Sequence, residues 1–254
     1  MDDGTIKLVC STTEDYLEKT KPYLQTVNNL SKAENVIMTV DFIPDVTFFA
    51  ELPHISWAKI SHDENEGAPE GTHSIQHGSF IDKVSDNDND VLIYTDCDIV
   101  MQRPFSDVEL LYFSTLPHNS VAVGWNSGPH EKLIHEALRL NMKMGVEELQ
   151  SLWGDNVLTE PCFNIGVLAA RKSTWRLMYN KYMEKWSAVG NTFGHRARQQ
   201  WLMCWVMAEL GLDRKIMPYW MHTHAHYGLP RGTVVYGNGI AGHQDRIILF
   251  RHRF

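Results

Sequence analysis

Hydrophobic positions in the first part of the chain alternate between strand-like and helix-like spacing. Residues 7–10 form an apolar run, and the STTED that follows supplies hydroxyl and acidic side chains suited to the start of a helix. Pro22 is expected to begin a second helical segment, and residues 35–42 have the pattern of another strand. Strands that alternate with helices need crossover connections, so this order predicts a parallel sheet covered by helices.

The rest of the chain continues the same α/β pattern. Residues 91–95 are apolar at every position, which is typical of a central parallel strand buried on both faces. Further helices are predicted over residues 73–84, 133–138, 175–186 and 202–210. Short strands or extended loops are predicted over residues 215–220, 233–236 and 246–250. We therefore expect a Rossmann-like α/β domain with a mostly parallel central sheet flanked by helices.

Composition narrows the class of protein. The chain has 254 residues, of which 43% are hydrophobic and 21% charged, a composition that suits one large domain. The net charge of −8 argues against a nucleic-acid partner, because a phosphate backbone needs clustered Lys and Arg. The sequence has no run of ~18 apolar residues and no apolar leader after its first Met, so we expect a cytoplasmic protein without an integral membrane segment. The four cysteines stand singly in apolar runs, as reduced core residues do.

The stretch SDNDNDVLIYTDCDIV, residues 85–100, contains three D-x-D pairs. The first five acidic and amide residues imitate the start of a calcium loop, but Val91 and Cys97 stand where that loop requires Gly and Glu. We interpret this part as a solvated turn that leads into the strand.

The third pair, Asp96 and Asp98, follows the buried strand directly. In extended backbone, residues i and i+2 point the same way, roughly 6 to 7 Å apart. The carboxyl end of a central strand is where open α/β sheets bind ligands. A divalent cation bridged to a diphosphate would relieve the repulsion between the two carboxylates, and Mg²⁺ and Mn²⁺ both accept carboxylate and phosphate oxygens.

Three segments resemble a known family in the same order and spacing. DVLIYTDCDIVMQRPF resembles the D-x-D region of nucleotide-sugar-dependent glycosyltransferases with the GT-A fold. PCFNIGVLAARKSTW is similar to the Y/F-F-N-A-G-V segment of family-eight retaining glycosyltransferases, and ARQQWLMCW is similar to that family's D-Q-D-x-L-N helix start. The resemblance implies a single GT-A domain over residues 1–254. About residues 1–98 would form its nucleotide-binding half, and about residues 99–254 the half that binds the acceptor and completes the metal site.

The sequence also departs from this family. Arg198 and Gln200 replace the acids of D-Q-D, which leaves Gln199 as the matching amide, and the family's closing H-x-x-G-x-x-K-P-W is absent. The His of that closing motif is a metal ligand in the family. The candidates for it here are His222, His224, His226, His243 and His252. His252 fits best because it follows the apolar run RIILF, and His243 is second.

The resemblance implies a role for each matching residue. Asp98 and the C-terminal His would bind Mn²⁺ or Mg²⁺, and Asp96 would contact both the metal and the ribose of a UDP-sugar. The nucleobase and ribose would lie against Ser11, Thr12 and Thr13, with Asp41 as a weaker candidate.

The same resemblance places two amides beside the reacting sugar. Asn164 and Gln199 would flank this sugar, and Gly166 would let backbone and sugar approach closely. Asn164 as a simple turn residue and Gln199 as an ordinary residue of a helix surface are the alternatives.

Other features leave alternatives open. Asp155 or Glu160 could serve as a general base for inversion, although the F-N-x-G-V segment favours retention. Trp125 and Trp220 could stack on a sugar ring or belong to the core. His222, His224 and His226 could share one strand face and bind zinc, but they match the metallo-hydrolase pattern poorly.

The sequence therefore predicts a metal-dependent glycosyltransferase that moves a sugar from a UDP-sugar to a carbohydrate or related acceptor. A glycoside hydrolase, which also needs paired carboxylates, is one alternative. A catalytically silent relative that binds nucleotide or glycan is the other. The oligomeric state is open. A sugar nucleotidyltransferase is disfavoured because CSTTEDY lacks a Gly-rich phosphate loop.

Overall fold

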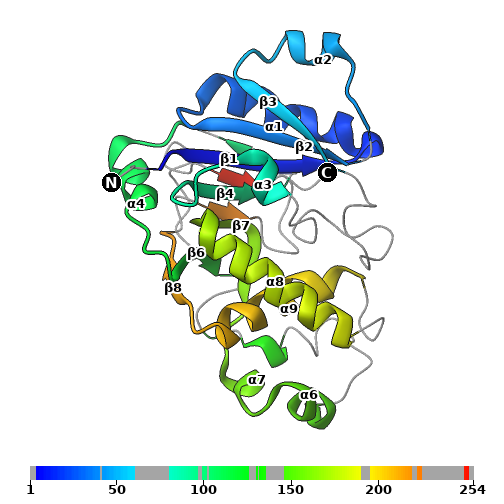
Figure 1. The fold of residues 1–254 in the computed structure, drawn as a ribbon, viewed down its shortest axis with the longest axis vertical. Coiled ribbons are helices and arrows are strands. Elements are labelled where there is room, and N and C mark those ends of the chain that lie inside the picture. The colour runs from blue at the N-terminus through cyan, green and yellow to red at the C-terminus, as the bar shows by residue number, and fades with distance from the viewer. Residues whose placement is uncertain are drawn as a thin grey trace.

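A computed structural model describes most of the chain and is shown in Figure 1. The described residues are 4–40, 42–60, 80–96, 99–101, 103–125, 130, 132–135, 146–189, 195–218, 222–224 and 249–251.

The central element is a seven-stranded sheet with the strand order β3-β2-β1-β4-β7-β6-β8. Its strands are β1 (Ile6–Thr12), β2 (Glu34–Val40), β3 (Ile55–Ile60), β4 (Val91–Thr95), β6 (Ser120–Trp125), β7 (Phe163–Arg171) and β8 (Asp213–Ile216). Most neighbouring strands are parallel, but β7 runs antiparallel to both β4 and β6. The expected α/β fold with a mostly parallel sheet is confirmed.

The strand order reverses between β1 and β4. The chain moves outward from β1 to β2 and β3, and then returns to place β4 on the other side of β1. Cys10 is paired with Thr95, the last residue of β4, and β1 continues beyond this pair to Thr12, so the two strands end at the same edge of the sheet. Such a switch point is where doubly wound sheets bind ligands.

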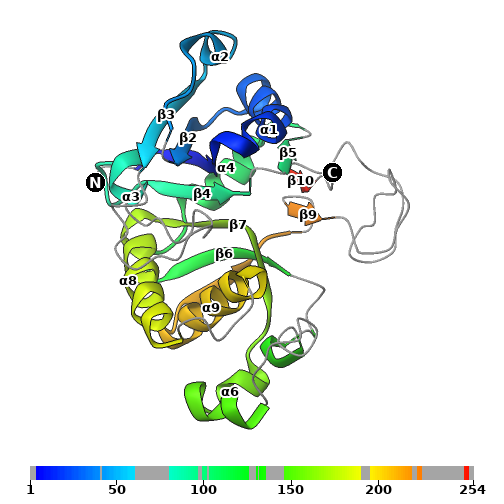
Figure 2. The same cartoon turned by 90° about the vertical axis from the view of Figure 1, so that its right-hand side faces the viewer.

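Helices cover both faces of this sheet (Figure 2). They are η1 (Glu14–Tyr16), α1 (Leu17–Leu30), α2 (Val46–Ala50), α3 (Phe80–Val84), α4 (Asp107–Ser114), α6 (Val146–Trp153), α7 (Asn156–Thr159), α8 (Lys172–Val189) and α9 (His195–Glu209). One buried cluster joins α1 and α4 to one face, and a second joins α8 and α9 to the other face. None of the helices that the structure describes is long and apolar enough to cross a membrane.

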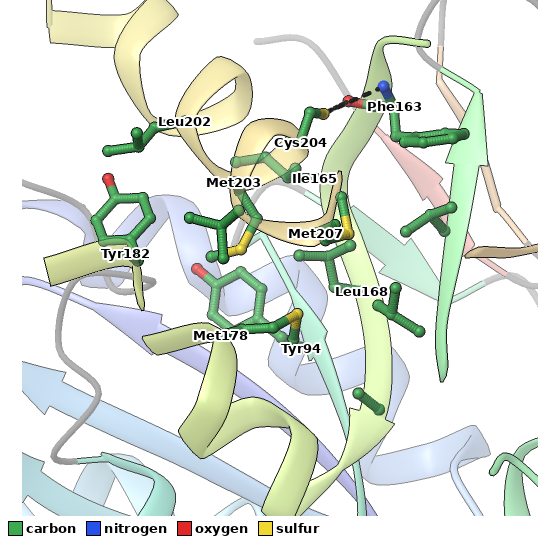
Figure 3. Packing of buried hydrophobic residues seen from close by; sticks show 14 of the residues in the cluster. Tyr94, Phe163, Ile165, Leu168, Met178, Tyr182, Leu202, Met203, Cys204 and Met207 are labelled. Atoms are coloured by element: carbon green, nitrogen blue, oxygen red, sulfur yellow. Dashed lines mark hydrogen bonds between the residues drawn. The ribbon is translucent and has the colours of Figure 1, made fainter. Parts of the chain in front are cut away.

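Alternation along the strands explains the two cores. Each of the five residues of β4 is buried, because successive side chains enter opposite cores. Tyr94 packs toward Met178 of α8 and Met203 and Met207 of α9 (Figure 3), whereas Ile93 packs in the core on the α1 side. Within the described residues, Cys10, Cys162 and Cys204 are buried and form no disulfide, as expected, and Cys97 lies outside this part of the chain.

A small second sheet has the order β5-β10-β9, with β5 (Ile99–Met101), β10 (Leu249–Arg251) and β9 (His222–His224). Figure 2 shows it on the same side of the molecule as the C-terminus. β10 is antiparallel to β5 and parallel to β9, so it joins the end of the chain to the segment that follows Asp98.

The prediction of a helix start at Pro22 was wrong, because Pro22 lies inside α1. A proline there removes one backbone donor from the helix. The helix continues because Tyr23, Leu24 and Val27 are buried against the sheet, and tertiary packing supplies most of a helix's stability. Of the helix expected over residues 73–84, the structure describes only α3, and residues 136–145 also lie outside the description.

Candidate functional site

Four chain segments end or begin at one edge of the central sheet. β1, β4 and β6 have their carboxyl ends there, and β7 begins there because it is antiparallel to β4 and β6. The backbone N–H of Asp96, directly after β4, donates a 2.8 Å hydrogen bond to the carbonyl of Gly166 on β7. This bond extends the pairing of β4 with β7 by one residue and fixes the backbone of Asp96.

Gly166 has two polar side chains where its own side chain would be. A Cβ atom added at Gly166 would lie 2.9 Å from Asp96 Oδ2 and 2.9 Å from Asn164 Oδ1. The two oxygens are therefore no more than twice that distance apart. The carboxylate and the amide occupy a space that is open only because residue 166 is glycine.

The side chain of Asn164 is oriented by its own strand. Its Oδ1 accepts a 2.9 Å hydrogen bond from the backbone N–H of Gly166, which identifies the oxygen and the nitrogen of the amide. Asn164 is only 3% exposed. Among the described residues, none accepts a hydrogen bond from its Nδ2.

A bulge between β6 and β7 produces this geometry. Val123 is paired with Leu168, but the next residue, Gly124, is paired with Asn164. The three residues between Asn164 and Leu168 are therefore extra on the β7 side. Bulges are common next to functional sites because they redirect side chains locally.

Helix α9 supports the start of β7. The thiol of Cys204 accepts a 3.3 Å hydrogen bond from the backbone N–H of Phe163 and lies 3.5 Å from the carbonyl oxygen of the same residue (Figure 3). The thiol thus contacts the backbone of the residue before Asn164, next to the bulge.

Helix α1 holds the ends of β1 and β4 from the other face. Thr95 Oγ1 donates a buried 2.8 Å hydrogen bond to Tyr23 Oη, directly before Asp96. Thr12 Oγ1 lies 2.9 Å from Thr20 Oγ1, and Thr12 is 3% exposed. Three residues were expected to contact the nucleoside. The hydroxyl of Thr12 is hydrogen-bonded to Thr20 instead, whereas Ser11 and Thr13 are partly exposed.

The other D-x-D pairs lie before β4, at the opposite end of this strand. Asp90 is buried and accepts hydrogen bonds from the backbone N–H of Thr5 and the hydroxyl of Ser85 at 2.7 and 2.6 Å. Asp88 forms an ion pair with Arg176 of α8 at 3.1 Å. The acidic residues before β4 therefore have a structural role, because their contacts hold the turn that leads into this strand.

The two candidate bases each contact another side chain. Glu160 forms a 2.8 Å ion pair with Arg214 of β8, and both side chains are partly buried. Asp155 precedes α7 and accepts a 3.2 Å hydrogen bond from Gln150. Figure 1 shows α7 near the bottom of the molecule, well separated from β4.

Several expected site residues lie outside the description. These are Asp41, Asp98, Trp220, His226, His243 and His252. The structure describes only the backbone of Gln199, as part of α9, and the backbones of His222 and His224, as part of β9. Within the described residues, no three His, Cys, Asp or Glu side chains form a group that could hold a metal ion.

Sequence reasoning missed the residues that support the site. Tyr23 and Cys204 look like ordinary core residues in a sequence, because their polar atoms meet partners from distant elements. The bulge at Asn164 also carries no sequence signal of its own. Gly166 alone indicated that another group could approach the backbone closely there.

No family model matches the sequence, and no curated protein matches it. Solved structures do resemble it. The galactosyltransferase LgtC in complex with donor and acceptor sugar analogues is 13% identical, with a TM-score of 0.56 over 97% of this chain and 86% of LgtC. Mouse xyloside xylosyltransferase 1 is 13% identical, with a TM-score of 0.56 over 97% of each chain.

The bifunctional glycosyltransferase WbbM is 14% identical, with a TM-score of 0.64 over 98% of this chain. This chain spans 46% of the length of WbbM. At such identities the likeness establishes the fold alone. The chain has the GT-A fold, as its D-x-D and F-N-x-G-V segments predicted.

Proposed function

We propose that this protein is a metal-dependent glycosyltransferase that transfers a sugar from a UDP-sugar to a carbohydrate or related acceptor. The observation that carries this proposal is the meeting of Asp96 and Asn164 at Gly166, beside the switch point of the sheet. A carboxylate next to an amide whose Nδ2 donates to none of the described residues suits a cation-bound diphosphate next to a sugar hydroxyl. The GT-A fold supports the same reading.

The residues at this edge fit a hard divalent cation. Carboxylate and amide oxygens are ligands of the kind that Mg²⁺ and Mn²⁺ accept. We propose that Asp96, Asp98 and His252 hold the ion. The sequence position supports His252 over His243, because His252 follows Arg251 and Asp98 precedes Ile99, and Arg251 and Ile99 are paired.

The bound cation would stabilise the negative charge of the departing diphosphate by Lewis acidity. The chain itself would supply binding and orientation. Ser11 and Thr13, at the end of β1, would contact the nucleoside, with Asp41 after β2 as a weaker contact. Asn164 would donate from Nδ2 to a hydroxyl of the transferred sugar, and Gln199 would face the same sugar from α9. In this reading residues 1–98 form the nucleotide-binding half and residues 99–254 the acceptor half.

We infer retention of configuration at the anomeric carbon. Inversion requires a general base within reach of the acceptor hydroxyl. Glu160 is held in an ion pair with Arg214, and Asp155 lies beside α7, away from β4, while the F-N-x-G-V segment favours retention.

A screen of nucleotide sugars, with and without Mn²⁺, tests the proposal through release of nucleotide. We expect release of UDP from at least one UDP-sugar that stops when the metal is chelated. Cleavage of a glycoside without nucleotide or metal would instead indicate a glycoside hydrolase. Mn²⁺-dependent binding of UDP without turnover of any donor would indicate a silent relative.

A further inference from the structure

Trp125 is an aromatic residue at the same edge of the central sheet. The proposed binding of the UDP-sugar assigns it no role. It is the last residue of β6 and is paired with Phe163, one residue from the pair of Gly124 with Asn164. Trp125 therefore lies at the same sheet edge as Asn164 and Asp96, and its side chain is partly exposed.

The indole ring of Trp125 has a rigid support. It stacks on the ring of Phe163, with centroids 5.2 Å apart and planes inclined by 28°. Phe163 is 2% exposed, and the guanidinium carbon of Arg214 lies 5.9 Å from the centroid of its ring. Arg214 is itself fixed by its ion pair with Glu160. A supported aromatic surface that keeps part of its area in solvent loses little conformational entropy when a ligand covers it.

The order of the strands indicates what this surface would bind. Along this edge the strands lie in the spatial order β1, β4, β7 and β6. In the proposed function, the nucleoside would lie at β1, the diphosphate at β4 and the transferred sugar at β7. The group bound at β6 would be the one that comes after the transferred sugar. Trp125 lies two strand spacings from β4, or about 10 Å. The transferred sugar at Asn164 occupies the intervening position, so the group that reaches Trp125 is the acceptor.

The chemistry of the ring suits a pyranose. An aromatic face carries partial negative charge, and the C–H groups on the apolar face of a pyranose carry partial positive charge. We propose that Trp125, supported by Phe163, is the stacking platform of an acceptor subsite that takes a pyranose ring. This inference rests on the proposed function, because the transferase reaction defines which sugar is the acceptor.

Saturation-transfer NMR tests the platform with methyl β-D-galactopyranoside and methyl β-D-glucopyranoside as probes, each with and without UDP and Mn²⁺. The variants are Trp125→Leu, which keeps an apolar side chain but removes the ring, and Trp125→Phe, which keeps an aromatic face. Trp57→Leu is the matched control, because Trp57 is exposed on β3 at the far end of the sheet. Thermal melting shows that each variant is folded.

We expect saturation of the ring C–H protons of at least one probe by the wild type. Trp125→Leu should reduce it at least fivefold, whereas Trp125→Phe and Trp57→Leu should keep at least half of it. Equal saturation in Trp125→Leu, or none in the wild type, would overturn the inference. Calorimetric titration of UDP with Mn²⁺ separates the two proposals. Failure of the wild type to bind UDP counts against the proposed function, while unchanged saturation in Trp125→Leu counts against the platform alone.

Discussion

Asp96 and Asn164 come from different strands and direct a carboxylate oxygen and an amide oxygen at the same point, 2.9 Å from each, where a side chain of residue 166 would begin. Both residues are held by hydrogen bonds to the backbone of Gly166. The backbone N–H of Asp96 is bound to the carbonyl of Gly166, and the amide oxygen of Asn164 is bound to the N–H of Gly166. One glycine therefore organises both side chains of the candidate site.

Replacing Gly166 with alanine should damage the site more than the fold. The new methyl group would meet the ends of two side chains, which can rotate away without moving the backbone. Displacement of positioned groups by about 1 Å typically costs about 100-fold in rate. We expect a loss of this order in nucleotide release and a loss of stability no larger than that of Asn164→Ala, because a rotated Asn164 no longer accepts from the N–H of residue 166.

Gly4→Ala provides the opposite control. A Cβ at Gly4 would lie against the backbone of Asn89 and Asp90, which cannot rotate away. We expect this variant to lose about 1 to 3 kcal/mol of stability and to retain its activity per folded molecule. Equal effects of the two variants on activity would show that Gly166 has no special relation to the site.

Asn164 combines a structural contact with a proposed contact to the sugar, and two substitutions separate them. Asn164→Ala leaves the buried N–H of Gly166 without its acceptor, at a cost of about 1 to 3 kcal/mol in stability. Asn164→Asp keeps the acceptor but removes both Nδ2 donors and brings a second negative charge near Asp96.

We therefore expect Asn164→Asp to remain folded and to lose nucleotide release at least as severely as Asn164→Ala. Chemical denaturation and the release assay measure the two effects separately. An Asn164→Asp variant with full activity would contradict the proposed role of the amide nitrogen.

Asp90 should be a stability residue. Its buried carboxylate accepts hydrogen bonds from Thr5 and Ser85, and Lys7 lies 3.8 Å away. Asp90→Ala removes these contacts, and we expect a loss of about 2 to 4 kcal/mol in the free energy of unfolding. Metal-dependent binding of UDP by the folded fraction should not change. If Asp90→Ala remained folded but lost metal binding, the acidic residues before β4 would be a candidate cation site.

Glu109 should make stability depend on pH in the acid range. Burial favours its neutral form, but the hydrogen bond from Arg103 and the bonds from Ser106 outweigh burial and lower its pKa to about 2. A carboxyl whose pKa is lower in the folded state stabilises the fold above its unfolded pKa and loses that contribution as pH falls toward the folded pKa. The window here runs from pH ~4.5 down to ~2.

At pH 7 we expect Glu109→Gln to be less stable than the wild type by about 3.5 kcal/mol at most, since each unit of pKa is worth about 1.4 kcal/mol and contact with solvent screens part of it. The difference should shrink as the pH falls through this window. Asp107→Asn is the matched control on the same helix, because its side chain is 94% exposed and its contact with Lys32 is a surface ion pair. A constant difference between Glu109→Gln and the wild type from pH 7 to 2 would contradict the assignment.

The sequence predicted the features that have short-range signals. The buried strand before Asp96, the helix over residues 175–186 and the GT-A fold follow from periodicity and from motifs whose residues are close in sequence. The carboxyl end of β4 as the ligand edge stays a prediction, drawn from the position of Asp96 after a strand that is apolar on both faces.

Other features depend on contacts between distant elements. The antiparallel direction of β7, the bulge before Leu168 and the hydrogen bond from Thr95 to Tyr23 arise from tertiary packing, which local patterns do not encode. Tertiary packing also explains why α1 continues through Pro22. The burial of one face of the helix outweighs the cost of the proline. The ion pair of Glu160 with Arg214 of β8 also joins distant parts of the sequence, and the role of Glu160 as a base stays a prediction.

The most direct test of the central claim is calorimetric titration of UDP into the protein with Mn²⁺ present, for the wild type, Asp96→Asn and Asp88→Asn. Asp88 is the control because its carboxylate pairs with Arg176 before the start of β4. We predict that UDP binds to the wild type only with the metal, that Asp96→Asn weakens this binding by about tenfold or more, and that Asp88→Asn leaves it unchanged. Binding of UDP that needs no metal, or that is equal in Asp96→Asn and the wild type, would contradict the account.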